Sequence, residues 1–207
     1  MTGPRRSRFR GAIAGVGTTS GVRVVVGRWT ESPYGGFADA MVETAAGHRV
    51  LLAPSSAVAE FVASTYSFDE VRIELFSVVA GPDAWTIRSK SLVLVVDLGA
   101  PTALGRLLRL IPDRVAEAPW WCTVTDPVAR LALRGVRTRG SAGNGRREYY
   151  GATRVRRISA ATGSFDGLDL GALAPVDPPP RFGFSSTPRR PVVTDVVTTV
   201  VDLSGGT

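Results

Sequence analysis

The sequence predicts an α+β fold: a mostly antiparallel, strongly curved or barrel-like sheet with two or three helices. Three observations favour this fold. Short runs rich in β-branched and aromatic residues follow one another along the 207 residues, with turn residues between them. Most connections between these runs are too short to hold a helix, which favours antiparallel neighbours over βαβ units. Helical periodicity is confined to two or three segments.

The first quarter of the chain has the pattern of consecutive hairpins. Residues 1–8 are basic and are expected to form a disordered arm, which leaves a single globular domain over residues 9–207. The Ser-Pro-Tyr-Gly-Gly sequence around Tyr34 is typical of a turn. Gly47 closes a three-residue hairpin connection, where a left-handed backbone is wanted. The strands expected here cover residues 9–16, 22–29, 37–44 and 48–53.

Helical spacing begins after this hairpin. Ser55 or Ser56 caps the first expected helix. Thr102 caps a second, which Pro112 ends, and residues 126–135 form a third that begins on an Asp-Pro pair. The apolar positions of the first helix are Val58, Phe61, Val62 and Tyr66. The strands expected between the first two helices cover residues 69–80, 84–88 and 91–98.

The last third combines loops with long strands. Residues 137–147 form a glycine-rich loop, and residues 148–161 form one long strand or a strand pair. Residues 163–180 are expected to be irregular, and a second loop covers residues 182–191. Residues 192–201 form the closing strand.

The net charge of +7 is unevenly distributed. Residues 106–190 carry a net charge of +8, and the first 20 residues carry +4. Lys90 is the only lysine, and so strong a preference for arginine fits the codon usage of a GC-rich genome. The basic excess therefore permits an anionic partner without requiring one.

Several classes of protein are disfavoured by what the chain lacks. No apolar run approaches the roughly 20 residues that cross a bilayer, so no membrane partner is expected and the cytoplasm is the default location. Cys122 is the only cysteine, and its tryptophan neighbours suggest a small buried apolar residue. His48 is the only histidine, which excludes a zinc site of the usual kind. We expect neither metal nor cofactor, and a homo-oligomer is compatible with the sequence.

The glycine-rich loop is the sharpest local feature. Asn144, Arg146 and Arg147 accompany three glycines within it, so backbone N–H groups and guanidinium groups could bind a phosphate or a carboxylate. The loop lacks the Gly-Lys-Ser/Thr of a nucleotide-binding P-loop, and it is followed by a strand rather than a helix. The alternative is a solvated hairpin loop.

Glu148 and the two tyrosines after it allow two interpretations. Basic and aromatic residues on one strand could bind a nucleic-acid strand. Equally, a tyrosine could fill the core while Glu148 pairs with an arginine, and this second interpretation is favoured because a basic patch alone is weak evidence. Nucleic-acid binding predicts that one face carries Arg137, Arg139, Arg146, Arg147, Arg154, Arg156 and Arg157.

A second group of polar residues surrounds the turn at residues 31–39. Glu31 and Asp39 place two carboxylates near Tyr34, an arrangement used in general acid–base chemistry. Ser32 has no histidine nearby, so a catalytic triad is not supported. The favoured interpretation is structural, with Asp39 hydrogen-bonded to the turn.

Lys90 is the last candidate. A lysine beside an apolar strand could form a Schiff base, as in β-rich enzymes of the acetoacetate decarboxylase type. The paired lysines of that family are missing here, so Lys90 is expected to lie in a turn between strands.

Five stretches together resemble an uncharacterised family of actinobacterial proteins with no assigned activity. They are residues 29–39, 51–54, 65–69, 140–150 and 182–188. The resemblance covers nearly the whole chain. It implies an actinobacterial source and a cytoplasmic single-domain protein, and it implies no catalytic residue.

Two hypotheses about function follow, and nucleic-acid binding ranks third. The first is a soluble protein that binds a small anionic ligand in a pocket at the mouth of the curved sheet. Its ligand-binding residues would be Arg146, Arg147, Asn144, Glu148, Trp29, Tyr34, Glu31 and Asp39. The second is an enzyme of unknown reaction that uses carboxylate and arginine residues in the same pocket.

Overall fold

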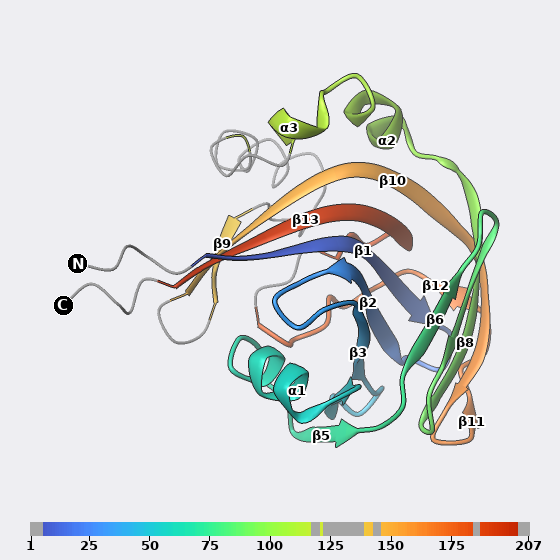
Figure 1. Ribbon diagram of the computed structural model, residues 1–207. Helices are drawn as coiled ribbons and strands as arrows, with labels where there is room; N and C mark the ends of the chain where they lie inside the picture. The colour runs from blue at the N-terminus through green and yellow to red at the C-terminus, as the bar shows by residue number, and fades with distance from the viewer. Residues whose placement is uncertain (1–5, 117–120, 122–138, 143–145, 184–186, 203–207) are drawn as a thin grey trace.

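Most of the chain forms one continuous, strongly curved sheet (Figure 1). The computed structural model describes residues 6–116, 121, 139–142, 146–183 and 187–202. Its strands are β1 (Arg6–Thr18), β2 (Arg23–Glu31), β3 (Phe37–Glu43), β4 (Arg49–Ala53), β5 (Glu70–Ile73), β6 (Ser77–Ala80), β7 (Ala84–Arg88), β8 (Leu92–Pro101), β9 (Arg139–Ala142), β10 (Arg146–Phe165), β11 (Leu168–Asp169), β12 (Leu173–Ala174) and β13 (Val192–Asp202). Their order across the sheet is β5-β4-β3-β2-β1-β13-β10-β8-β7-β6, with β9 and β11 paired to β10 and β12 paired to β1.

Strands β1 to β4 form an antiparallel meander, as the hairpin pattern predicts. Gly47 adopts a φ of 86° in the β3–β4 connection, which is the left-handed conformation expected there. Side chains alternate between the two faces of these strands. On β2, Val24 and Val26 point into the curve of the sheet, while Val25 and Gly27 lie on the opposite face.

The sheet is mixed because one pair of strands runs parallel. Helix α1 (Ser56–Ala63) connects β4 to β5, and β5 then pairs with β4 in the same direction. The Ser55 side chain accepts a hydrogen bond from the backbone N–H of Val58, which starts the helix as expected. The other strand pairs in the described ranges are antiparallel. The strand-after-strand pattern did not reveal this crossover, since α1 is short and β5 has only four residues.

Strand β10 carries the sheet around its bend. Its first half pairs with β13 and its second half pairs with β8. The register shifts between Ala152 and Arg154 and again on both sides of Ile158. Such irregularities increase the local bend and twist of a strand. The long strand expected over residues 148–161 is therefore confirmed and is longer at both ends.

Two short helices lie over β10 (Figure 1). Helix α2 (Ala103–Leu108) begins where the Thr102 hydroxyl accepts a hydrogen bond from the Gly105 N–H, and the predicted cap is confirmed. Helix α3 (Asp113–Ala116) is a single turn. A Cβ atom on Gly105 would stand 2.2 Å from the carbonyl oxygen of Val155, so the glycine lets α2 approach β10 closely.

The two faces of the sheet bury two apolar cores. The larger core fills the inside of the curve, and its fully buried residues include Val26, Leu52 and Leu94. The smaller core lies under α1, where Leu51 and Val58 meet. Because neighbouring residues on one strand face opposite cores, Leu51 and Leu52 serve one core each.

Side chains join the two ends of the curved sheet. Strand β5 is at one end and β6 is at the other, and three residues connect them. The Arg72 guanidinium donates hydrogen bonds to Asp166 at 2.5 Å and to Ser91 at 3.0 Å. The Glu74 carboxylate accepts hydrogen bonds from the hydroxyls of Ser89 and Ser91. Contacts between side chains thus span the gap between the first strands and the β8–β10 side of the sheet.

Three predictions about elements need correction. Residues 6–8 belong to β1 rather than to a disordered arm, because they pair with the end of β13. The strand expected over residues 69–80 is divided at residues 74–76, where the chain passes from one end of the sheet to the other. Residues 163–180 contain the end of β10 together with β11 and β12. The helix expected over residues 126–135 and Cys122 lie outside the described residues. No helix in the described ranges is long and apolar enough to cross a membrane.

Candidate functional site

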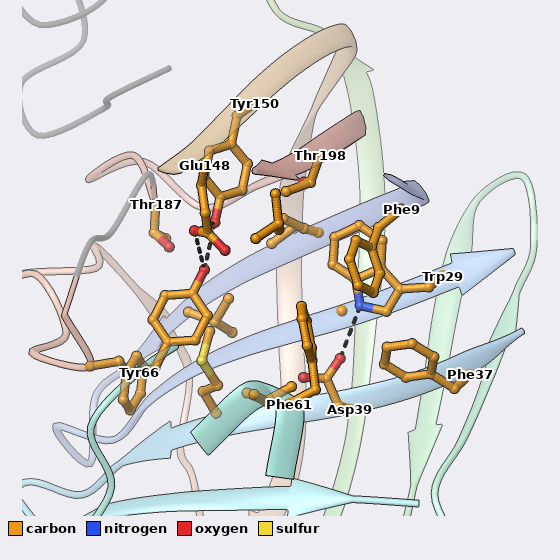
Figure 2. A pocket seen from close by; sticks show the side chains of 17 residues that line it. Phe9, Trp29, Phe37, Asp39, Phe61, Tyr66, Glu148, Tyr150, Thr187 and Thr198 are labelled. Atoms are coloured by element: carbon orange, nitrogen blue, oxygen red, sulfur yellow. Dashed lines mark hydrogen bonds between the residues drawn. The ribbon is translucent and has the colours of Figure 1, made fainter. Parts of the chain in front are cut away.

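A hollow lies on the face of the sheet that α1 covers (Figure 2). Its volume is about 80 Å³, room for several water molecules or a compact organic group, since one water needs roughly 10–15 Å³. Its walls come from β1, β2, β3, β10, β13, α1 and the segments that contain Tyr66, Phe182 and Thr187. The lining residues are Phe9, Ile13, Val25, Gly27, Trp29, Phe37, Asp39, Met41, Phe61, Val62, Tyr66, Glu148, Tyr150, Phe182, Thr187, Thr198 and Val200.

Aromatic rings form one side of the hollow. The Phe9 ring packs on Phe61 with a centroid separation of 5.0 Å and meets the edge of Trp29 at 5.7 Å. Phe37 lies 6.4 Å from Trp29. These separations lie within or near the range of favourable ring pairs. The rings therefore present a rigid apolar wall to whatever occupies the hollow.

Asp39 is a buried carboxyl group on β3. It accepts a hydrogen bond from the Trp29 indole N–H at 3.1 Å. Burial raises the pKa of Asp39 to about 7, and the Trp29 hydrogen bond opposes this shift only in part. Gly27 makes room for the pair, because a Cβ atom there would stand 2.4 Å from the Asp39 oxygen and 2.7 Å from the indole nitrogen. The sequence suggested that Asp39 is hydrogen-bonded to the turn at residues 31–36. That prediction is wrong, because its hydrogen bond comes from Trp29.

Three oxygen atoms meet on another side of the hollow (Figure 2). The Tyr66 and Tyr150 hydroxyls both lie 2.9 Å from the same Glu148 carboxyl oxygen, and they lie 2.5 Å from each other. Burial raises the pKa of both tyrosines, and the neighbouring Glu148 charge raises it further. Asp39 also acts on the Tyr66 pKa, which shows that the two polar groups lie within electrostatic range of each other.

The number of protons constrains this triangle. Each hydroxyl has one proton to donate, so an ionised Glu148 leaves one of the three short contacts without a hydrogen. A neutral Glu148 supplies the third proton, and then every contact can be a hydrogen bond. A closed ring of three hydrogen bonds therefore requires the protonated acid.

Thr198 lines the hollow and has a buried hydroxyl that is unpaired among the described residues. The residue is 4% exposed, and its Oγ1 atom has no hydrogen-bond partner within the described part of the chain. Leaving a buried hydroxyl unpaired costs about 1–3 kcal/mol. An unsatisfied polar atom at a cavity wall is a feature that a bound molecule can explain.

A buried ion-pair group fixes the segment that brings Phe182 to the hollow. Glu43 is 1% exposed and lies 3.1 Å from the Arg23 guanidinium. It also accepts hydrogen bonds from the backbone N–H of Arg181 at 2.6 Å and from the Arg181 side chain at 3.1 Å. The end of β3 therefore determines where Phe182 stands.

The structure brings together some of the residues that the sequence singled out. Trp29, Asp39 and Glu148 line one hollow although they are far apart in the sequence. Tyr34 is 42% exposed and packs on Phe61, and it does not line the hollow. Glu31 is also excluded, because its exposed side chain pairs with Arg10 at 3.8 Å.

The glycine-rich loop that was expected to bind an anion lies largely outside the described residues. Asn144 lies outside the described residues. Arg146 and Arg147 begin β10, opposite Asp202 and Val201 of β13, but their side chains are not among those that the structure describes. Glu148, which follows them, is the part of this segment that the structure brings into the hollow.

Several lining residues were not identified as site residues from the sequence. Phe61 and Tyr66 were expected to be core positions of a helix, and Tyr150 was expected to fill the core. Thr198 sits in a run of β-branched residues where threonine is ordinary. A signal for Thr198 existed only in the alternation of β13, which predicts that Thr198 and Val200 share a face.

The other sequence candidates lie elsewhere. Lys90 is exposed in the turn between β7 and β8, as expected, and lines neither this hollow nor the cleft discussed below. His48 is hydrogen-bonded to Glu70 at 3.1 Å. The arginines expected on one face do not all share it: Arg154 and Arg156 line a cleft, whereas the exposed Arg157 does not.

Comparison with known proteins gives little further information. No protein-family model and no curated protein matches the sequence. Among solved structures, the chain is similar to the acetoacetate decarboxylase from Legionella pneumophila subsp. pneumophila, with 10% sequence identity and a TM-score of 0.43. The match covers 97% of this chain and 87% of that one. A likeness this weak carries no argument about chemistry.

Proposed function

We propose that the hollow binds a compact, largely apolar, uncharged organic molecule that carries a hydrogen-bonding group such as a carbonyl or a hydroxyl. The observation that carries this proposal is the unpaired Thr198 hydroxyl in a wall built mainly from aromatic and aliphatic side chains. Mostly apolar pockets with a few placed polar groups are the usual form of small-molecule sites.

The charge of the wall supports an uncharged ligand. Its described titratable groups are the carboxyls of Asp39 and Glu148 and the hydroxyls of Tyr66 and Tyr150. No arginine or lysine is among the residues that line the hollow in the described ranges. An anion would therefore meet acidic groups, and this hollow gives no support to the anionic ligand expected from the sequence.

Thr198→Val tests the proposal because it separates stability from binding. Valine has nearly the same shape but no hydroxyl, so we expect the empty variant to be as stable as the parent protein or more stable. Ligands found by a thermal-shift screen of uncharged ketones, alcohols and amides should bind the variant about tenfold more weakly, the loss of one hydrogen bond.

Thr199→Val is the matched control. Thr199 is the next residue on β13, is similarly buried and does not line the hollow. This variant should leave the affinity unchanged. The proposal is wrong if no uncharged compound binds, or if Thr198→Val leaves the affinity of every bound compound unchanged.

A second candidate function is catalysis of proton transfer at the same site. The observation that favours it is the Asp39 pKa of about 7, which lets this carboxyl group accept or release a proton at neutral pH. A carbonyl oxygen near the Tyr66–Tyr150–Glu148 ring could take over one of its hydrogen bonds, and the ring would become a chain that donates to the substrate. Asp39 could then remove a proton from the carbon beside the carbonyl.

Deuterium exchange distinguishes the enzyme from the binder. A bound ketone should exchange its α-hydrogens in D₂O, as followed by NMR, and Asp39→Asn should abolish the exchange while the ketone still binds. If the parent protein binds the ketone without accelerating exchange, binding alone remains.

A further inference from the structure

A second, larger cleft lies on the other face of the same strands. Its volume is about 330 Å³, within the usual size range of small-molecule sites. It opens inside the curve of the sheet, next to α2, and Trp85, Leu98 and Val193 of the main core form its apolar part. The described residues that line it are Ala12, Arg28, Ala80, Gly81, Trp85, Leu98, Pro101, Gly105, Arg109, Arg154, Val155, Arg156, Val193 and Asp195.

Strand alternation places the charges of this cleft. Gly27 faces the hollow under α1, so the next residue, Arg28, faces the cleft. Arg154 and Arg156 are two residues apart on β10 and share this face. Arg109 follows α2 at the rim of the cleft.

Positive charge exceeds negative charge in the cleft. Among the described residues, four arginines line it beside a single carboxylate, Asp195, and Arg154 lies 3.8 Å from that carboxylate. Burial raises the pKa of Asp195, while the charges of Arg154, Arg156 and Arg28 oppose this shift. Those three guanidinium groups therefore surround one carboxylate, whose single negative charge neutralises only one of their three positive charges.

The arginines differ in how they are held. Arg156 donates hydrogen bonds to the carbonyl oxygens of Gly99 at 3.1 Å, Leu98 at 3.3 Å and Pro82. Its charge is thus fixed in place by the backbone. Arg28 and Arg109 have no hydrogen bond or ion pair with any residue in the described ranges. Their donors are available to a ligand.

We propose that this cleft binds a small organic polyanion, whose phosphate or carboxylate oxygens are contacted by Arg28, Arg109 and Arg154. Arg156 contributes a fixed positive charge behind them. The apolar part of the cleft, with Trp85 and Leu98, packs against the carbon skeleton of the ligand. This site is separate from the hollow and does not depend on the function proposed for it.

Calorimetric titration with two probes, inorganic phosphate and citrate, tests the proposal. Ionic strength is held constant because surface charges are screened by salt. At least one probe should bind with one-to-one saturation. Arg28→Gln and Arg109→Gln should each weaken that binding about tenfold or more, as expected when a charge-assisted hydrogen bond is lost. Preference for phosphate or for citrate distinguishes the two kinds of anion.

Arg88→Gln is the control for net charge. Arg88 is exposed at the end of β7 and does not line the cleft, so this variant should bind as the parent protein does. Equal weakening by Arg88→Gln and Arg109→Gln would overturn the proposal, since only the overall charge would then matter. Absence of saturation with both probes would overturn it too, as would binding confined to single-stranded oligonucleotides.

A measurement on the parent protein covers the case in which Arg28→Gln does not fold. The backbone amide of Gly105 lies at the cleft, and the amide of Gly35 lies in an exposed turn elsewhere. Titration with the bound probe should shift the NMR signal of Gly105 and leave that of Gly35 in place. The opposite pattern would locate the anion outside the cleft and overturn the proposal.

Discussion

Asp39 illustrates how single residues set the chemistry of the hollow. A carboxyl group is seldom fully buried unless it is paired. Here its one described hydrogen-bond partner is the neutral indole of Trp29, and Gly27 leaves the space in which the two meet. Because no positive charge compensates the burial, the acid is held in its protonated form up to near neutral pH.

Asp39 should make the protein less stable as the pH rises. Its pKa is about 7 in the folded protein against 3.8 ordinarily, so between these values the folded state holds a proton that the unfolded state has lost. Stability therefore falls from about pH 4 to pH 7, by on the order of 4 kcal/mol, and is then constant. Asp39→Asn should remove most of this dependence, as measured by urea unfolding at several pH values.

Glu31→Gln provides the comparison for that experiment. Glu31 is a carboxylate with a largely exposed side chain, so the pH dependence of this variant should match the parent protein. A parent protein whose stability does not fall between pH 4 and pH 7 would contradict the environment described for Asp39.

At the same scale, the sequence could predict only part of the site. Trp29, Asp39 and Glu148 were identified because aromatic and acidic residues near turns are unusual enough to be noticed. Thr198 and Tyr66 were not, because a threonine in a strand and an apolar ring on a helix have ordinary structural roles. They become site residues only through their neighbours in the fold, and those neighbours depend on the strand order β3-β2-β1-β13-β10.

Among the elements, α2 and β10 approach each other closely at Gly105. The helix has only six residues, and Gly105 faces the Val155 carbonyl. A Cβ atom at this position would stand only 2.2 Å from the carbonyl oxygen, so there is no room for a side chain. The helix also brings Arg109 to the second cleft. The position of this helix therefore controls both local packing and the shape of the cleft.

Gly105→Ala should push α2 away from β10. We expect a loss of about 1–3 kcal/mol in the free energy of unfolding, the usual cost of overpacking. Chemical denaturation measures it. Gly99→Ala is the control, since a Cβ atom there would have no neighbour closer than 3.6 Å. Equal effects of the two substitutions would contradict the close approach of α2.

Strand β5 shows where pattern-based prediction reached its limit. Val71, Ile73 and Leu75 alternate with polar residues, which correctly predicts extended backbone. These apolar side chains are nevertheless exposed, at 45%, 58% and 92%. Alternation identifies two faces but does not say which is buried, and it cannot show that the chain leaves one end of the sheet at residue 74 to begin the other.

At the scale of the whole molecule, side chains close the curved sheet where the backbone pairing ends. The backbone ladder does not join β5 to β6 in the described residues. Arg72 and Glu74 join the two sides instead, through Asp166, Ser89 and Ser91. The pKa of Glu70 is lowered to about 2 by its hydrogen bonds from Arg72 and His48, which keeps the acid charged beside Arg72.

Arg72→Gln should loosen this closure. The substitution removes hydrogen bonds to Glu70, Asp166 and Ser91, so we expect a loss of roughly 1–3 kcal/mol and a melting temperature lower by several degrees. Amide hydrogen exchange should accelerate in β5 before it changes in β1 or β13. Uniform acceleration across the sheet would contradict a role confined to its ends.

The hollow and the cleft share a wall that is one strand thick. Gly27 and Arg28 are consecutive residues, and Gly27 lines the hollow whereas Arg28 lines the cleft. In the same way, Ile13 lines the hollow and Ala12 lines the cleft. A ligand in the hollow that shifts β2 must also move the residues that contact a ligand in the cleft. If the first ligand changes the affinity for the second, the second changes the affinity for the first by the same factor, because such linkage is reciprocal.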